Sequence, residues 1–349
     1  MSRHVGTRVL RDSLAVRRKA VRMSPRDLIA SEPLLPGKAI PLVVRPTFEE
    51  VDLVTWAEGN RAFVDELLSR HRALLFRGFS IRTVSEFERF IAATSTGRMV
   101  EYRDRSSPRH IVSDKIYTST DYPADQRIAL HNEGTYWQMW PLKIYFFCQV
   151  APDSDGATPI ADTRRVYERI SAATRRRFME KRVLYQRNFN QGFGLTWQTA
   201  FQTDDPSALE DYCRSNKISL EWLGGGRLRA RQVRPAVEHH PRTGEPIWFN
   251  HAAFFHITGL EPTMRETLLT EFAPESLPFN TYYGDGSDFE PEVLEEIRAA
   301  YAAEEVSFPW QVGDVLLLDN MSVAHGRQAY TGERTILVGM ADPHNRQDG

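Results

Sequence analysis

The chain has 349 residues, of which 41% are hydrophobic and 26% charged, and its 44 basic and 46 acidic side chains leave a net charge of −2. This composition is typical of a folded globular protein and excludes a collagen, a coiled coil and a wholly disordered chain. Because the charges nearly cancel, no overall field favours nucleic acid or an anionic membrane, and we expect neither as a partner.

Cysteine use and hydropathy favour a cytoplasmic protein. Cys148 and Cys213 lie outside any Cys-x-x-Cys or Cys/His cluster, so we expect neither a disulfide framework nor a structural zinc site. The longest apolar runs are far shorter than the ~20 residues that span a bilayer. The N-terminal sequence also lacks the apolar region of a secretory signal.

The first segment of the chain is strongly basic. Residues 1–28 hold eight arginine or lysine side chains and only two aspartates. A solvated chain end, an organelle transit peptide and a basic arm for a partner all fit this pattern. We predict a basic N-terminal extension over residues 1–35 and one domain over residues 36–349.

After this segment, strands lie on both sides of a helix-bearing middle segment. This order favours a mainly β, mixed α/β domain with a large insertion. We predict strands at 73–76, 144–148, 314–319 and 334–340, helices at 85–93, 163–181 and 289–301, a turn at 153–156 and a glycine loop at 224–226.

Three residues are candidate metal ligands. His131 and Glu133 are separated by one residue, and on a strand such side chains point to the same face. A His-x-Glu pair is common by chance, and a lone histidine is usually structural, so a third ligand is needed. His325 follows the apolar run 315–318 and is the candidate. Two imidazoles and one carboxylate form the facial triad of non-haem Fe(II) oxygenases.

Arg334 opens the last predicted strand, nine residues after His325. If it faces inward with Ile336 and Val338, its charge is costly to bury unless it meets an anion. A carboxylate that accepts from both arms of the guanidinium would offset that cost. An exposed arginine at the start of a strand is the alternative that these residues leave open.

Several short motifs, which follow one another along the chain, contain or flank these candidate residues. They are Ala-Leu-Leu-Phe-Arg-Gly-Phe at 73–79, Leu-His-Asn-Glu at 130–133, Gly-Ala-Thr-Pro-Ile-Ala-Asp at 156–162, Trp-Gln-Val-Gly-Asp at 310–314, and the stretch 319–334 with its His-Gly-Arg and Gly-Glu-Arg. Together they resemble the Fe(II)/2-oxoglutarate-dependent dioxygenases of the taurine dioxygenase (TauD/TfdA) superfamily, over about residues 36–343. The SyrP-like branch, which hydroxylates amino-acid units in natural-product pathways, is the most similar. The resemblance implies a double-stranded β-helix, or jelly roll, with helical insertions.

The resemblance also implies a site and a chemistry. His131, Glu133 and His325 would bind Fe(II). Thr158 and Arg334 would bind 2-oxoglutarate, the cosubstrate consumed with O2, with Arg334 on its distal carboxylate. The expected reaction is hydroxylation of an unactivated C–H bond with release of succinate and CO2, because related halogenases lack the carboxylate that Glu133 supplies. Desaturation or cyclisation at the same site, and a metal-binding enzyme that is not an oxygenase, are the alternatives.

The candidate substrate-binding residues are Arg109, Tyr136, Asn250 and Arg327. Arg109 ends a Ser-Ser-Pro-Arg block similar to one in the SyrP-like group, and its guanidinium could bind a carboxylate of the substrate. Each of the four also has a purely structural interpretation. Arg109 would be a surface arginine and Tyr136 a core residue. Asn250 would be a buried amide whose hydrogen bonds are all made within the protein, and Arg327 would only support the site. The resemblance suggests an amino-acid substrate that is free or tethered to a peptide or carrier protein, to which the basic N-terminus could dock. A homo-oligomer is left open.

Overall fold

The structure is a computed structural model, and it describes residues 24–101, 104–106, 110–113, 115–119, 122–190 and 192–346. Arg109 and residues 1–23 of the predicted extension lie outside the described residues. None of the helices in the described ranges combines the length and the apolar character that crossing a membrane requires.

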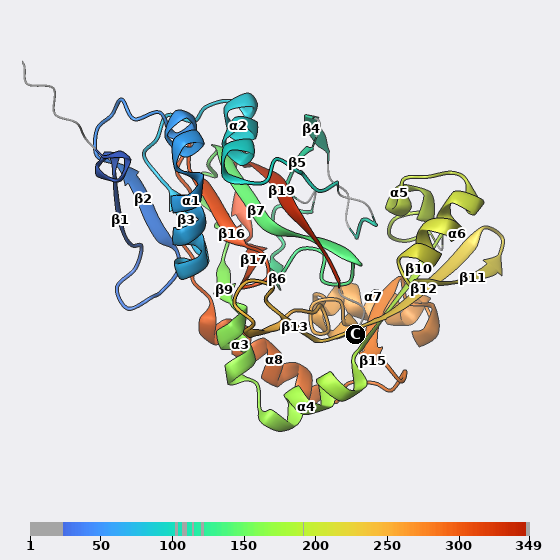
Figure 1. The fold of residues 1–349 in the computed structure, drawn as a ribbon. Helices are drawn as coiled ribbons and strands as arrows, with labels where there is room; N and C mark the ends of the chain where they lie inside the picture. The colour runs from blue at the N-terminus through green and yellow to red at the C-terminus, as the bar shows by residue number, and fades with distance from the viewer. Residues whose placement is uncertain are drawn as a thin grey trace, which may run out of the picture.

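An eight-stranded sheet is the largest element of the fold (Figure 1). Its neighbouring strands are antiparallel, apart from one parallel pair near the N-terminus. The first strand falls within the segment predicted as the extension and follows a short 3-10 helix, η1 (Pro25–Leu28). In sheet order the strands are β1 (Ile29–Pro33), β2 (Leu42–Pro46), β3 (Ala73–Phe76), β16 (Val315–Asp319), β7 (Met139–Val150), β19 (Thr335–Asn345), β5 (Ile116–Thr118) and β4 (Ile111–Ser113).

The central strands of this sheet are buried on both faces. In β16, Val315 and Leu317 pack in the core beneath helices α1 (Leu53–His71) and α2 (Val84–Thr94), whereas Leu316 and Leu318 pack in a second core on the other face. Successive side chains of a strand point to opposite faces, which divides them in this way. The apolar run is therefore continuous in the sequence because both faces of the sheet are covered.

A smaller sheet lies against the inner face of the large one. Its strands, in order, are β6 (Ile128–His131), β17 (Val323–Arg327) and β9 (Ile160–Asp162). Residues of both sheets line one cavity, so the sheets face each other across it. A further short pair consists of β18 (Tyr330–Thr331) and β8 (Ser154–Asp155). The predicted mainly β architecture is confirmed.

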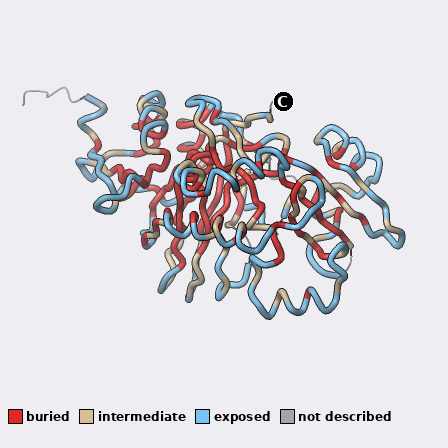
Figure 2. The backbone as a smooth tube through the Cα atoms, turned by 90° about the horizontal axis from the view of Figure 1, so that it is seen from below, coloured by how far each residue is buried: buried red, intermediate tan, exposed pale blue. Residues whose placement is uncertain are grey.

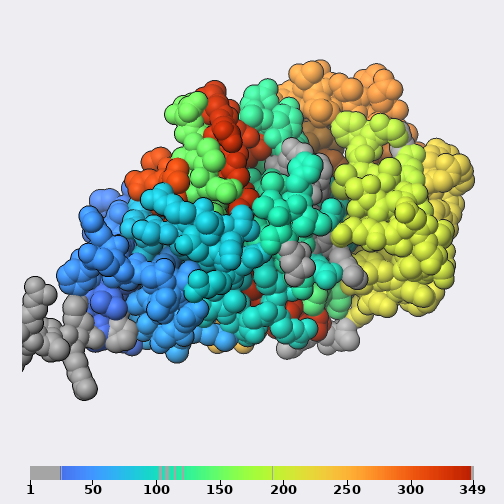
Figure 3. Space-filling model, turned by 90° about the horizontal axis from the view of Figure 1, so that it is seen from above, coloured from blue at the N-terminus to red at the C-terminus, as the bar shows by residue number. Residues whose placement is uncertain are grey.

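The middle segment between β9 and β16 forms the helical insertion. Figures 1 and 3 show its α5–α6 and β11–β12 part at the opposite end of the molecule from the N-terminal strands. The insertion contains a four-stranded sheet, in the order β11 (Ser219–Gly224), β12 (Arg227–Arg234), β10 (Val183–Phe189) and β15 (Phe279–Tyr283), and the pair β13 (Val237–His239) and β14 (Pro246–Trp248). Its helices are α3 (Thr163–Arg169), α4 (Ala172–Lys181), α5 (Trp197–Phe201), α6 (Pro206–Ser215), η2 (Ile257–Gly259), α7 (Pro262–Glu271), η3 (Pro274–Ser276) and α8 (Pro291–Glu304).

Burial is concentrated in the strands at the centre of the molecule, and the helices expose their outer faces (Figure 2). Three predicted features differ from the structure. The turn expected over 153–156 contains the short strand β8, which pairs with β18. The helix expected over 163–181 is broken into α3 and α4, because the Ser171 hydroxyl caps α4 by accepting from the Thr174 N–H at 3.2 Å. The strand that carries His131 ends at that residue, so Glu133 lies beyond it.

Candidate active site

The two candidate histidine ligands face each other across neighbouring strands. The register pairs His131 of β6 with His325 of β17, and their ring centroids are 4.6 Å apart. Glu133 reaches the same place from the turn after β6, which corrects the expectation that strand alternation would bring it there. One ligand atom from each of the three residues lies within 4.8 Å of the others, and the described part of the chain holds no second such group of His, Cys, Asp or Glu.

The surroundings of His131 fix the orientation of its ring. Its Nδ1 lies 2.9 Å from the carbonyl oxygen of Ala129, so the Nδ1–H tautomer donates there and leaves the Nε2 lone pair for a metal. Phe254 stacks on the ring, with centroids 4.4 Å apart and planes 18° apart. A buried imidazole that is held on two sides in this way is pre-oriented as a ligand.

Two asparagines and a histidine clasp the segments that carry the ligands. The Asn132 amide donates to the carbonyl of Asn320 at 2.6 Å. The Asn320 side chain in turn accepts from the Glu133 N–H at 2.8 Å and donates to the Glu133 carbonyl at 2.9 Å. The Nε2 of His251 lies 2.7 Å from the Asn132 carbonyl oxygen. We call Asn132, Asn320 and His251 the ligand clasp, and it was missed in the sequence because its members come from three distant segments.

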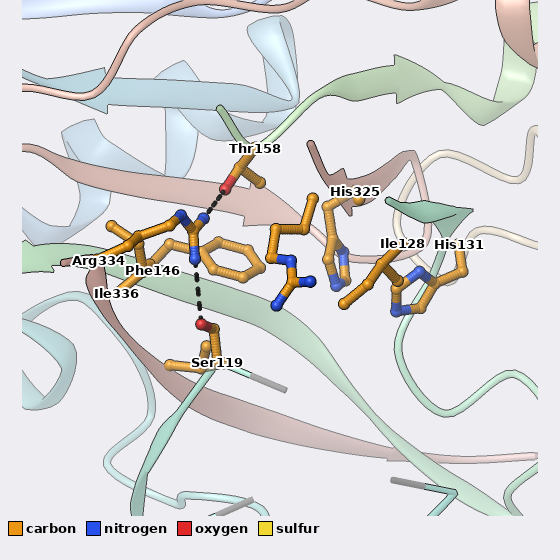
Figure 4. A pocket seen from close by; sticks show the side chains of 11 residues that line it. Ser119, Ile128, His131, Phe146, Thr158, His325, Arg334 and Ile336 are labelled. Carbon is orange, nitrogen blue, oxygen red and sulfur yellow. Dashed lines mark hydrogen bonds between the residues drawn. The ribbon is translucent and has the colours of Figure 1, made fainter. Parts of the chain in front are cut away.

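A cavity opens between the two sheets beside the paired histidines (Figure 4). In Figure 4, Arg334 lies beside the apolar side chains of Phe146 and Ile336, and the paired histidines lie across the cavity from them. The lining residues are Ser119, Ile128, His131, Phe146, Thr158, His325, Gly326, Arg327, Arg334, Ile336 and Val338.

Neutral groups hold the guanidinium of Arg334 in this cavity. Its Nε donates to the Gly156 carbonyl at 2.8 Å, Nη1 to the Ser119 hydroxyl at 3.2 Å and Nη2 to the Thr158 hydroxyl at 3.3 Å (Figure 4). Among the described residues no Asp or Glu forms an ion pair with it. Burial, and then the nearby charge of Arg327, lower the pKa of Arg334 to about 10. A part-buried cation held only by neutral acceptors is a site for an anion.

The Thr158 hydroxyl is prepared to donate a hydrogen bond. Its oxygen accepts from Arg334 Nη2 and from the indole Nε1 of Trp310, the latter at 3.2 Å. Because both contacts use the oxygen as an acceptor, the hydroxyl hydrogen is left for a ligand in the cavity. This placement agrees with the role that the family resemblance implies for Thr158.

Arg327 lines the same cavity but also holds the chain that leads into β6. Its guanidinium donates to the carbonyls of Tyr122 and Gln126, each at 2.8 Å, and to that of Pro123. The guanidinium also lies over the ring of Tyr330, 5.3 Å from its centroid. Arg327 therefore positions one rim of the cavity and adds positive charge to it.

The three described candidates for substrate binding, Tyr136, Asn250 and Arg327, do not line one common cavity. The buried Tyr136 donates its hydroxyl to a backbone carbonyl at 2.8 Å and does not line the cavity of Arg334. Backbone groups occupy both ends of the Asn250 amide, at 2.8 and 2.9 Å, and this residue lines a different cavity. Arg109 lies outside the described residues. The substrate roles of these residues stay predictions.

Comparison with known proteins identifies the family. The family model "Taurine catabolism dioxygenase TauD, TfdA family" matches residues 31–341. The dapdiamide synthesis protein DdaC of Enterobacter agglomerans is 42% identical over 280 residues, which cover 80% of this chain and 85% of DdaC. A clavaminate synthase-like protein of Arabidopsis thaliana is 27% identical over 311 residues, which cover 86% of this chain and 89% of that protein.

Solved structures share the fold. PvcB of Pseudomonas aeruginosa matches 92% of each chain with a TM-score of 0.55 and 15% identity. A second PvcB structure, described as that of an Fe, alpha-ketoglutarate dependent oxygenase from an isonitrile synthetic pathway, matches 92% of this chain and 93% of that one with a TM-score of 0.54 and 18% identity. The predicted jelly-roll fold is confirmed, while the SyrP-like branch stays a prediction. The chain belongs to the taurine catabolism dioxygenase TauD, TfdA family and is a dioxygenase.

Proposed function

We propose that this dioxygenase is an Fe(II)/2-oxoglutarate-dependent hydroxylase whose iron is bound by His131, Glu133 and His325. The observation that carries the proposal is the convergence of two imidazoles and one carboxylate within 4.8 Å of one another. This donor set suits Fe(II) and leaves adjacent coordination positions open. The contact of His131 Nδ1 with a backbone carbonyl is typical support for a metal-binding histidine, so these residues fit the ion.

Arg334 and Thr158 would bind 2-oxoglutarate in the cavity beside the iron. The guanidinium offers donors to the distal carboxylate, and the Thr158 hydroxyl offers one more. The apolar side chains of Phe146, Ile336 and Val338 exclude water from the same cavity, which strengthens the charge pair. When bound, iron, 2-oxoglutarate and O2 supply the oxidant that attacks an unactivated C–H bond, with release of succinate and CO2.

The chain itself would contribute position and protection. The ligand clasp holds the backbone on both sides of Glu133, and the stacked Phe254 holds His131. Arg327 keeps the rim of the cavity in place through three backbone carbonyls. Such fixed geometry lets an enzyme hold one C–H bond near the reactive centre and keep bulk water away.

The proposed substrate is a small molecule of amino-acid type in a natural-product pathway, free or tethered to a peptide or carrier protein. The likeness to a dapdiamide synthesis protein supports this class. The carboxylate of Glu133 supports hydroxylation, and desaturation or cyclisation is the alternative outcome at the same site. A metal-dependent hydrolase is disfavoured because it would have no use for the cation of Arg334. Both cysteines are buried and free, which supports a location in the reducing cytoplasm.

Anaerobic addition of Fe(II) and 2-oxoglutarate to the metal-free chain tests this function. We expect a weak visible charge-transfer band at roughly 500 nm. His131→Ala and His325→Ala should each abolish the band, whereas His239→Ala, which changes an exposed histidine of β13, should leave it. A folded wild-type chain without the band, or ligand variants that keep it, would contradict the proposal. Product analysis with O2 and candidate substrates then separates hydroxylation from desaturation or cyclisation.

A further inference from the structure

The two arginines that line the cavity between the sheets both contact the ring of one tyrosine, Tyr330. This residue begins β18, and its ring centroid lies 5.3 Å from the guanidinium carbon of Arg327 and 5.5 Å from that of Arg334. We call the space that the two arginines line the Arg334 cavity, and Tyr330 is not among its lining residues. The ring therefore contacts both cations from outside the cavity and leaves the space in front of them for a ligand.

The backbone fixes the position of this ring. β18 pairs with β8, so that Tyr330 lies opposite Asp155. Gly156 allows the two strands to approach closely, because a Cβ at residue 156 would lie only 2.8 Å from the Cβ of Tyr330. The carbonyl of the same Gly156 accepts from Arg334 Nε at 2.8 Å. One short strand pair thus sets both a hydrogen bond and an aromatic ring against the guanidinium of Arg334.

Tyr330 and Arg327 also hold the same stretch of backbone, residues 122–126. The Tyr330 N–H donates to the Ala124 carbonyl at 2.9 Å. Three further carbonyls of this stretch accept from Nη1 and Nη2 of Arg327. Both Nη atoms of Arg327 are thereby directed at the backbone, so Arg334 is the better placed of the two arginines to receive an anion.

The ring can hold both cations without using their hydrogen-bond donors. The N–H donors of a guanidinium lie in its plane, at its edge. The face of an aromatic ring attracts a cation that lies within about 6 Å of its centroid. This attraction opposes the repulsion between the two arginines, through which the charge of Arg327 lowers the pKa of Arg334. A side chain that is already held in place loses less conformational freedom when a ligand binds.

We propose that Tyr330 is a positioning residue for cosubstrate binding, whose ring holds Arg334 ready for the distal carboxylate and keeps Arg327 on the backbone of residues 122–126. This inference rests on the proposed function, because it takes 2-oxoglutarate to be the ligand of Arg334. Tyr330 acts through the two arginines and does not touch the cosubstrate. The aromatic ring carries the role, so phenylalanine should serve as well as tyrosine.

A double-mutant cycle between Tyr330 and Arg334 tests the role. Equilibrium titration of the full-length chain with 2-oxoglutarate, in the presence of Mn(II), gives the dissociation constant. Tyr330→Leu should raise it about three- to tenfold, the cost of ordering one long side chain on binding. In an Arg334→Met background the same replacement should change it less than about twofold, because the side chain through which the ring acts is gone. Tyr330→Phe should match the wild-type chain, and none of the Tyr330 variants should alter the affinity for Mn(II) alone.

Tyr167→Leu is the matched control. Tyr167 of α3 is also half-buried, its ring lies 4.5 Å from the guanidinium carbon of Arg175, and it does not line the Arg334 cavity. Its replacement should leave the affinity for 2-oxoglutarate unchanged. Wild-type affinity in Tyr330→Leu, a loss in Tyr330→Phe, or an equal loss in the Arg334→Met background would each overturn the inference and leave the proposed function intact. Should Tyr330→Leu fail to fold, Tyr330→Met decides the outcome. A wild-type chain that binds no 2-oxoglutarate would overturn the proposed function, and this inference with it.

Discussion

Replacing Arg334 by methionine would remove the proposed anchor for 2-oxoglutarate while keeping an apolar stem. The guanidinium is already aligned by Gly156, Ser119 and Thr158, so little side-chain order has to be lost when a carboxylate binds. Breaking a buried charge pair costs about 2–5 kcal/mol. Because Arg334 is only part-buried, we expect the lower part of this range, about 2–3 kcal/mol. The dissociation constant of 2-oxoglutarate should then rise roughly 30- to 150-fold.

The same replacement should not destabilise the ligand-free chain. Arg334 has no carboxylate partner among the described residues, so only hydrogen bonds to neutral groups offset the cost of burying its charge until a ligand binds. Arg77 offers the contrast, because it is buried and pairs with the buried Asp314 at 2.6 Å. Arg77→Met leaves that carboxylate alone and should lower the free energy of unfolding by about 3–5 kcal/mol.

Two measurements check this reasoning. Equilibrium titration with 2-oxoglutarate in the presence of Mn(II) gives the affinity, and urea denaturation of the ligand-free chain gives the free energy of unfolding. Arg334→Lys keeps the charge but loses the planar fork, so its affinity should fall between wild type and Arg334→Met. The reasoning is refuted if Arg334→Met binds 2-oxoglutarate as tightly as wild type, or if it is destabilised as strongly as Arg77→Met.

The remaining predictions concern the ligand clasp, the carboxylate ligand and a buried histidine. In a Mn(II) titration, Asn320→Ala should weaken metal binding about 10- to 100-fold, because Asn320 holds the backbone of Glu133. Asn188→Ala is the control, since Asn188 is a buried amide of the insertion that also donates to backbone carbonyls. It should leave metal binding unchanged. Glu133→Gln keeps the shape of the ligand but removes its charge, and in the same titration it should weaken metal binding by more than Asn320→Ala does. Burial, and then the charge of Arg298, lower the pKa of His256 from 6.5 to about 4. The unfolded chain therefore takes up this proton first, and the stability that neutral His256 contributes above pH 6.5 is lost as the pH falls toward 4, by about 2 kcal/mol at pH 5. His256→Gln should flatten that part of the pH dependence of urea denaturation, and an unchanged slope would show that His256 does not titrate in this way.

The strands were accessible from the sequence because local signals specify them, whereas the pairing of His131 with His325 came from the ligand pattern and the family resemblance. The apolar run 315–318 predicts a strand buried on both faces, and β16 (Val315–Asp319) is one. The residues around Arg334 left open an exposed arginine, and only the family resemblance implied a role in the site; in the structure Arg334 lines the same cavity as Ile336 and Val338. The strand β16 depends on the two-residue period of its side chains, which can be judged from a few neighbouring residues.

Other features depend on contacts between distant segments and carried no local signal. The ligand clasp joins Asn132 to Asn320 and His251, and a single asparagine or histidine in a sequence does not reveal its partner. The break between α3 and α4 is different, because the Ser171 hydroxyl that caps α4 is a local signal that the prediction of one helix over 163–181 passed over. Glu133 was predicted as a ligand, but through the alternation of a strand that in fact ends at His131.

The measurement that tests the central claim most directly is anomalous scattering at the iron absorption edge, from crystals grown anaerobically with Fe(II) and 2-oxoglutarate. We predict one strong peak within bonding distance of Nε2 of His131, the carboxylate of Glu133 and the imidazole of His325. A peak at another position, or an imidazole of His325 turned away from an iron held by the other two residues, would contradict the account.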